Sequence, residues 1–235
     1  MPQTSALPKY IQISEMLIRE VAAGHLPDGV KLPPEREMAA DLGIAVGTLR
    51  KSLADMQEKG LLQRIHGSGN YVRAKSEIGS VYAFFRLEKV SGGGLPTARV
   101  LSVDRLPKPE GAPDFGASPD GHRIRRLRWL DDELIALEEI WLDGSFRESI
   151  TAEDLSESLY LFYREELGLS ISAVEDSIGC AQVPAWSPRE FHLAVGTHTG
   201  FIERVSRLNG GAPVEYSRTW FDANRSRYIS RMGRG

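Results

Sequence analysis

The chain has 235 residues, of which 41% are hydrophobic and 26% charged, and its formal net charge is −3. This composition is typical of a globular protein with one large or two modest domains, and it excludes collagen-like, coiled-coil and wholly disordered chains. No stretch reaches the ~18 consecutive apolar residues that a membrane span needs. The N-terminus lacks the basic flank and apolar run of a signal peptide, and the single cysteine cannot form an internal disulfide. We therefore expect a cytoplasmic protein without a membrane partner.

Positive charge is slightly concentrated at the start of the chain. Residues 1–75 hold 10 Lys and Arg against 8 Asp and Glu, whereas the remainder holds 19 against 24. This bias favours nucleic-acid binding by the first part, but it is also within the scatter expected between any two domains.

The first part of the chain is predicted to fold as three helices followed by a β-hairpin. Apolar residues recur at helical spacing in each helical segment, and a glycine follows each segment. The hairpin is indicated by two short apolar runs around a Gly-rich turn. The expected bounds are 9–23 for the first helix, a short helix between Pro33 and Gly43, about 47–59 for the third helix, and strands at 61–65 and 71–72.

A polar segment without periodicity, residues 73–80, separates this block from the rest. We expect an N-terminal domain over 1–75, a linker over 76–80 and a second domain over 81–235.

The second part alternates strands and helices irregularly around antiparallel hairpins, which is typical of an α+β fold and not of a Rossmann fold. Asn209 and Gly210 form its strongest hairpin signal. We expect strands at 97–106, 123–130, 134–142, 170–182, 200–208 and 213–222, a helix at 157–167, a capped helix starting at 187–190, and a long loop at 107–121.

Signals for catalysis are missing from the sequence. It has no Gly-rich phosphate loop with a lysine, no paired-His zinc helix and no Gly-x-Ser-x-Gly elbow. His192 and His198, on either side of an expected helix end, have no obvious third ligand, so neither a metal nor a cofactor is expected. Cys180 lies in an apolar strand without a neighbouring base, which predicts a packed thiol and not a nucleophile.

The third helix carries polar residues that suit the major groove of DNA. Thr48, Arg50 and Lys51 lie off its apolar stripe near the helix start, where a recognition helix contacts base edges. Arg36 on the preceding helix is placed to reach a phosphate or a base edge.

The hairpin that follows can serve as a wing. Gly67 allows the backbone to approach a duplex, and Arg64 and His66 supply positive or polar contacts. The alternative is an ordinary small helical domain whose charges are solvated.

Taken together, these segments closely resemble the GntR family of bacterial repressors, whose DNA-binding domain is a winged helix-turn-helix. The resemblance implies that Arg36, Thr48, Arg50 and Gly67 contact operator DNA. It rests on the strings LPPEREMA at 32–39, LG at 42–43, TLRKSL at 48–53, EKGLL at 58–62 and GSGNYV at 67–72.

The sequence departs from the family pattern in three places. Pro34 stands where the family has Ser or Thr, and Asn70 replaces a usual Thr in the wing. Ala45, Val46 and Gly47 replace the common Ser-Arg-Thr, which removes one phosphate-binding hydroxyl and one base-reading arginine.

The second part has a set of short motifs, namely Arg126 to Arg128, Glu138, Ser158 to Tyr160, Pro213 to Glu215 and Trp220 to Asp222. With these motifs it resembles the effector-binding UTRA domain of the HutC-type subfamily, and the resemblance implies a chorismate-lyase-like fold with an antiparallel sheet and helices. The four tryptophans are expected in the core.

Arg126 and Arg128 are two residues apart on a predicted strand, so both side chains leave one face. Two adjacent guanidinium groups repel each other unless an anion lies between them, and Arg binds carboxylate or phosphate in a bidentate manner. The expected effector-binding residues are Arg126, Arg128, Glu138, Ser158, Tyr160 and Glu215. The resemblance implies a small anionic metabolite such as a phosphosugar or an amino-acid-like compound. The alternative is that the two arginines pair with Glu138, Glu139 or Glu165 on a solvated sheet face.

The sequence therefore predicts a homodimeric repressor that binds an inverted repeat in double-stranded DNA and responds to a small molecule. Two other classes stay open: a chorismate-lyase-like enzyme acting on a small organic acid, and a protein-interaction module.

Overall fold

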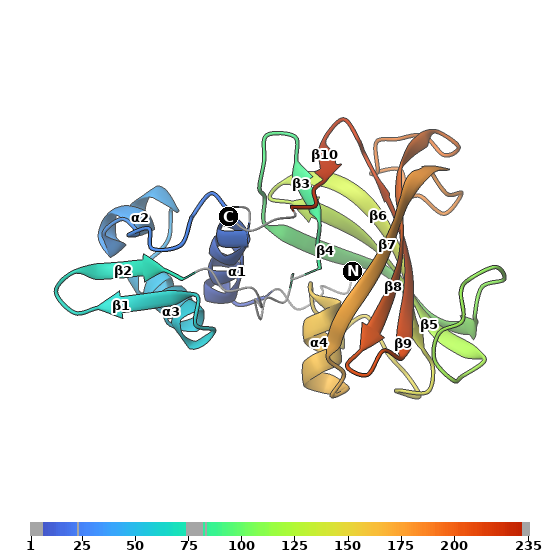
Figure 1. Cartoon of the computed structure of the whole chain (residues 1–235). Coiled ribbons are helices and arrows are strands. Elements are labelled where there is room, and N and C mark those ends of the chain that lie inside the picture. Colours follow the sequence, from blue (N-terminus) through green and yellow to red (C-terminus); the bar gives the residue numbers. More distant parts are fainter. Residues whose placement is uncertain (1–6, 23, 74–81, 83, 232–235) are drawn as a thin grey trace. The chain divides into compact units, whose positions relative to one another are not determined.

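The computed structural model describes residues 7–22, 24–73, 82 and 84–231 (Figure 1). The chain divides into two compact units, one formed by described residues within 7–86 and 229–231, the other by 87–228. The expected linker at 76–80 lies outside the described residues, so its bounds stay a prediction. No helix among the described residues is long and apolar enough to cross a membrane.

The first unit has the predicted three helices and hairpin. The apolar stripe of the third helix, Leu49, Leu53 and Met56, is fully buried in its core. The hairpin gains a short third segment, because Leu32 donates its N–H to the carbonyl of Asn70 at 2.9 Å. The elements are α1 (Lys9–Ala22), α2 (Glu35–Asp41), α3 (Val46–Glu58), β1 (Leu62–Ile65) and β2 (Gly69–Val72).

A buried ion pair ties α1 to the end of α3. Lys59 Nζ lies 2.8 Å from Glu15 Oε1 and 2.8 Å from Asp55 Oδ2, and the Glu15 side chain is completely buried. Burial lowers the pKa of Lys59, but the two nearby carboxylates outweigh it and leave that pKa raised. The charged form of Lys59 is therefore favoured beside the buried Glu15 side chain.

The second unit is built on one antiparallel sheet with the strand order β4-β5-β6-β9-β8-β7. A separate two-stranded ribbon joins β3 (Leu87–Lys89) to β10 (Ser226–Tyr228), and strands of three residues are too short to give a period in the sequence. The α+β prediction is confirmed. The other elements are β4 (Pro96–Pro107), β5 (Asp120–Leu130), β6 (Glu133–Asp143), α4 (Leu159–Glu166), β7 (Ile171–Gln182), β8 (His198–Leu208) and β9 (Pro213–Phe221).

Different segments of the chain pack on the two faces of this sheet. On one face, α4 packs Leu159, Phe162 and Tyr163 against buried aliphatic residues of β5 and β6. We call this the α4 face. On the opposite face, the loop at 108–119 buries Phe115 against Trp141 and Tyr216 of the sheet.

The segment after β7 corrects one prediction. The capped helix expected at 187–190 does not form, and the segment consists of turns. Pro184 and Pro188 each start a turn, closed by the N–H groups of Ser187 and Phe191 at 3.0 Å. Burial of Phe191 against Trp220 outweighs the local cap signal.

A second correction concerns Cys180, which was expected to be a packed thiol and is exposed. The reason is topological, since β7 is an edge strand and most of its residues are exposed.

His192, expected beside a helix end, instead pairs with Asp222.

The start of α3 offers a test of this fold. Ala45 occupies the N-cap with extended backbone angles (φ −68°, ψ 140°) and makes no side-chain cap hydrogen bond. Because a hydroxyl there can accept from an unpaired helix N–H, we expect Ala45→Ser to raise the free energy of unfolding by about 1 kcal/mol in urea denaturation. Ala54→Ser, at an exposed position inside α3, is the matched control and is expected to lower it slightly. Equal effects of the two variants would contradict this cap assignment.

Candidate DNA-binding and effector sites

The polar residues predicted to contact DNA lie on the outside of the first unit. Arg36, Arg50 and Lys51 are exposed, and Thr48 is half-buried in the first turn of α3. Gly43, with φ +62°, makes the tight turn that joins α2 to α3. The geometry is that of a helix-turn-helix with α3 in the position of the recognition helix.

The wing presents the remaining predicted residues. Arg64, His66 and Gly67 are all exposed in or beside the turn between β1 and β2. Gly67 has φ +73°, a conformation that favours glycine. Ser68 and Tyr71 join their hydroxyl groups at 2.7 Å across the base of this turn.

One acidic residue, Glu35, links α3 to the wing. Arg50 Nε donates to Glu35 Oε2 at 2.7 Å, and Arg64 Nη2 donates to Glu35 Oε1 at 2.7 Å. The hydrogen bond from Arg50 lowers the pKa of Glu35 against the smaller opposing effect of burial. Arg64 Nε also donates to buried Asn70 at 3.2 Å. Two arginines from separate elements are thus held on one carboxylate.

Sequence reasoning missed this role of Glu35. Glu35 lies 15 residues from Arg50 and 29 from Arg64 in the chain. No periodicity or spacing rule reaches across such separations.

The second predicted site lies on the α4 face. Arg126 and Arg128 on β5 both bind Glu138 on β6, which is the direct cross-strand neighbour of Arg126. Arg128 donates through Nε to Oε1 and through Nη2 to Oε2, both at 3.1 Å. Each of the three side chains is at most 8% exposed. This cluster is the Arg126–Glu138–Arg128 group.

The same guanidinium groups reach the segment that leads into α4. Arg126 Nη1 and Arg128 Nη1 donate to the carbonyl oxygen of Glu157 at 3.3 and 3.4 Å. Ser158, the next residue, caps α4 by accepting from the N–H of Leu161 at 3.3 Å. Ser158 therefore lies beside the arginines, while its hydroxyl group caps the helix.

Charge explains the pKa values in the Arg126–Glu138–Arg128 group. Burial raises the pKa of Glu138, but the two guanidinium charges outweigh it and lower that pKa to about 2. Burial and the neighbouring Arg128 lower the pKa of Arg126. Two arginines and one glutamate together carry one net positive charge. The sequence analysis considered pairing of the two arginines with Glu138 on a solvated sheet face. The structure shows this pairing, but in a buried position.

Tyr160 and Glu215 meet in a neighbouring buried cluster on the same face. Glu215 accepts from Tyr163 at 2.6 Å, from Ser206 at 2.7 Å and from Tyr160 at 3.3 Å. Burial raises the pKa of Glu215 although these hydroxyl groups oppose the rise. Tyr163 and Ser206 were not among the predicted residues, because only the strand order places them beside Glu215.

Glu139, which was also considered as a partner for Arg126 and Arg128, points to the opposite face of the sheet. It accepts from Arg125 Nε at 2.7 Å and also pairs with Arg218. Glu165 lies on α4 and pairs with Arg164. The alternation of β6 therefore separates two neighbouring glutamates onto different faces.

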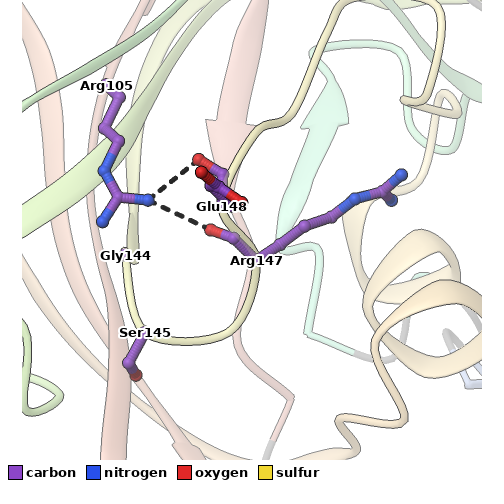
Figure 2. Close-up of a pocket in the computed structure, with 5 residues that line it drawn as sticks. All are labelled: Arg105, Gly144, Ser145, Arg147 and Glu148. Atoms are coloured by element: carbon purple, nitrogen blue, oxygen red, sulfur yellow. Dashed lines mark hydrogen bonds between the residues drawn. The ribbon is translucent and has the colours of Figure 1, made fainter.

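A surface hollow of about 560 Å³ lies apart from all of these residues (Figure 2). It is lined by Arg105, Gly144, Ser145, Arg147 and Glu148. Figure 2 shows Arg105 Nη1 donating to the main-chain carbonyl oxygens of Arg147, at 3.2 Å, and Glu148, at 2.9 Å. This arginine braces a loop, and the hollow coincides with neither predicted site.

Comparison with known proteins identifies the class. The model of the gntR family of bacterial regulatory proteins matches residues 9–72, and the UTRA domain model matches residues 91–227. The chain is thus a DNA-binding transcriptional regulator of the GntR family that carries a UTRA effector-binding domain. This class gives no support to the enzyme alternative.

Particular relatives share this arrangement along nearly the whole chain. The HTH-type transcriptional regulator SmoD of Agrobacterium fabrum is 60% identical over 97% of both chains. The mannosyl-D-glycerate transport/metabolism system repressor MngR of Escherichia coli is 28% identical over 92% of both. The solved structure of YydK from Bacillus subtilis has the same fold, with a TM-score of 0.54, 24% identity, and coverage of 97% of this chain and 100% of that one.

The Arg126–Glu138–Arg128 group yields a stability prediction. Glu138→Gln removes the carboxylate and leaves two buried guanidinium charges, which is expected to lower the free energy of unfolding by about 3–5 kcal/mol. Glu165→Gln is the matched control, because its exposed pair with Arg164 is expected to contribute less than about 1 kcal/mol. Urea denaturation measures both. A loss no larger for Glu138→Gln than for Glu165→Gln would contradict the buried assignment.

Proposed function

We propose that this regulator is a homodimeric repressor whose operator affinity is controlled by a small anionic metabolite bound on the α4 face. One observation carries the effector part: the nearly fully buried guanidinium groups of Arg126 and Arg128 lie side by side on β5 and both bind Glu138. Because guanidinium groups bind carboxylate and phosphate in a bidentate manner, this pair suits a ligand that carries either group.

Other residues of the same face suit a polar ligand. We assign Ser158, Tyr160 and Glu215 to hydroxyl or amino groups of a ligand, for which they would exchange their present hydrogen bonds within the protein. Phosphosugars and amino-acid-like compounds both have this chemistry. The name of MngR, which pairs a sugar with a carboxylate, supports an anionic sugar derivative and supports the assignment as a repressor.

In the first unit, we assign base or phosphate contacts to residues on the surface of the helix-turn-helix and the wing. Arg50 and Lys51 project from α3, and the wing adds a second point of contact. Two copies would place two such helices one duplex turn apart, about 34–36 Å, on an inverted repeat. We also propose that the protein acts in the cytoplasm, where it would meet its operator. The assigned residues are Arg36, Thr48, Arg50, Lys51, Arg64, His66 and Gly67.

Regulation then requires a difference in affinity between two states. An effector shifts an equilibrium only when it binds the DNA-incompetent arrangement more tightly than the competent one. We assign the hinge to residues 73–80.

Arg50 provides the test of DNA recognition. Arg50→Ala is expected to weaken operator binding by about 1–3 kcal/mol, and to do so through one base position, because a guanidinium reads a guanine edge in the major groove. Fluorescence anisotropy with operator duplexes that differ at single positions measures this. Arg189→Ala, an exposed arginine of the other unit, is the control. Equal weakening on every duplex would make Arg50 a phosphate contact.

Arg126 provides the test of effector binding. A thermal-shift panel of phosphosugars, amino acids and organic acids is expected to contain a compound that raises the melting temperature of the wild type. Arg126→Ala is expected to remove that shift while operator affinity in the absence of the compound is unchanged, and Arg164→Ala on α4 is expected to keep the shift. Loss of both the shift and operator binding in Arg126→Ala would assign Arg126 a folding role and contradict the effector assignment.

A further inference from the structure

Within the described residues, two peptide bonds cross the division between the units. One joins Arg86 to Leu87, and the other joins Tyr228 to Ile229. Leu87 and Tyr228 are cross-strand partners in the ribbon formed by β3 and β10. Both chain segments therefore leave the second unit at the same end of this ribbon.

Tyr228 ties the ribbon to the six-stranded sheet. Its hydroxyl group donates to Asp176 Oδ2 of β7 at 2.7 Å. The Asp176 side chain is only 8% exposed and also accepts two hydrogen bonds from Arg204 of β8, at 2.6 and 2.7 Å. Hydrogen bonds to an ionised group are stronger than bonds between neutral groups. The ribbon is thus fixed to a buried ion pair.

Arg204 continues these contacts to the cluster around Glu215. Burial lowers the pKa of Arg204, but the hydrogen bond to Asp176 and the interactions with Tyr160 outweigh it and leave that pKa raised. The Tyr160 hydroxyl group in turn bonds with Ser206 at 2.9 Å and donates to Glu215 at 3.3 Å. A ligand that takes over a bond of Tyr160 would therefore change the surroundings of Arg204.

Beyond the ribbon, both chain segments belong to the first unit. Ile229 donates its N–H to the carbonyl oxygen of Arg86 at 2.8 Å, so the pairing continues one step past the ribbon. Arg19 of α1 donates to the carbonyl oxygen of Phe85 at 3.3 Å, and its guanidinium carbon lies 5.1 Å from the centre of the Phe85 ring. Helix α1 shares its core with α3, so this contact reaches the body of the helix-turn-helix.

We propose that the hydrogen bond from Tyr228 to Asp176 couples the effector cluster to the DNA-binding unit. Arg204 relays a change at Tyr160 to Asp176, and the ribbon transmits it to the segments that meet α1. Tyr228, Asp176 and Arg204 act as positioning residues, because they hold the ribbon and contact neither operator nor effector. Hydrogen-bond networks and rigid elements with two arrangements can carry coupling of this kind. Because the coupling needs an effector on the α4 face, it rests on the proposed function.

Tyr228→Phe tests this link, because it removes one hydroxyl group and keeps the ring. The operator dissociation constant of the full chain is measured without and with a saturating amount of the compound found in the thermal-shift panel. The ratio of the two constants is expected to be at least tenfold in the wild type and below about threefold in Tyr228→Phe. The variant is expected to keep the thermal shift. A bond that only stabilised the second unit would change its unfolding and leave the ratio unchanged.

Tyr216→Phe is the matched control. Tyr216 also donates its hydroxyl group to a carboxylate of the same sheet, that of Glu203, but on the face opposite α4. Its ratio is expected to equal that of the wild type.

The other end of the path is tested by Arg19→Met, which removes the guanidinium group and keeps an unbranched side chain. The ratio is expected to fall as in Tyr228→Phe, and Lys9→Met, at an exposed position of α1, is expected to leave it unchanged. If both residues lie on one path, the double variant Arg19→Met with Tyr228→Phe loses no more coupling than either single variant. Additive losses would contradict a shared path.

Hydrogen exchange of the wild type gives a readout that needs no variant. The compound is expected to change the protection of the Ile229 N–H, which closes the pairing beyond the ribbon. Unchanged protection at Ile229 would overturn the proposal.

The same measurements separate this proposal from the function itself. A wild-type ratio in Tyr228→Phe or in Arg19→Met, or a lost thermal shift in Tyr228→Phe, would overturn the coupling path and leave the proposed function standing. A wild type that binds the compound but keeps the same operator affinity would overturn the proposed function and the path with it.

Discussion

The second unit of this regulator is organised around two buried guanidinium groups that share one carboxylate. Arg126, Arg128 and Glu138 together carry a net positive charge in a place with little access to water. Such a group is costly to bury, and replacing ion pairs of this kind with apolar residues often stabilises a protein. The proposed function gives this group on the α4 face, near the hydroxyl groups around Glu215, the role of binding a ligand anion.

The first unit shows a similar arrangement on its surface. Glu35 holds Arg50 of α3 and Arg64 of the wing, so the two arginines are oriented before DNA arrives. Side chains held in this way lose less conformational entropy when they bind. In the proposed complex, acceptor groups of the duplex would compete with Glu35 for the same donors.

Local patterns predicted most elements and the shared side of Arg126 and Arg128. Helical spacing placed the core stripe of α3, and alternation placed both arginines on one face of β5. The remainder depended on contacts between distant parts of the chain. The exposure of Cys180 follows from the strand order, the turns at 187–190 from burial of Phe191, and the grouping of Tyr163 and Ser206 with Glu215 from the packing of α4 on the sheet. None of these contacts has a period that a sequence can display.

Regulation requires that occupancy of the α4 face change the free energy of DNA binding. Such coupling is reciprocal, and values of about 1–3 kcal/mol are typical of allosteric proteins. The most direct measurement is the operator dissociation constant of the wild type, without and with a saturating amount of the compound that raises its melting temperature most. The account predicts a change of at least tenfold, equivalent to about 1.4 kcal/mol. An identical dissociation constant under both conditions would contradict it.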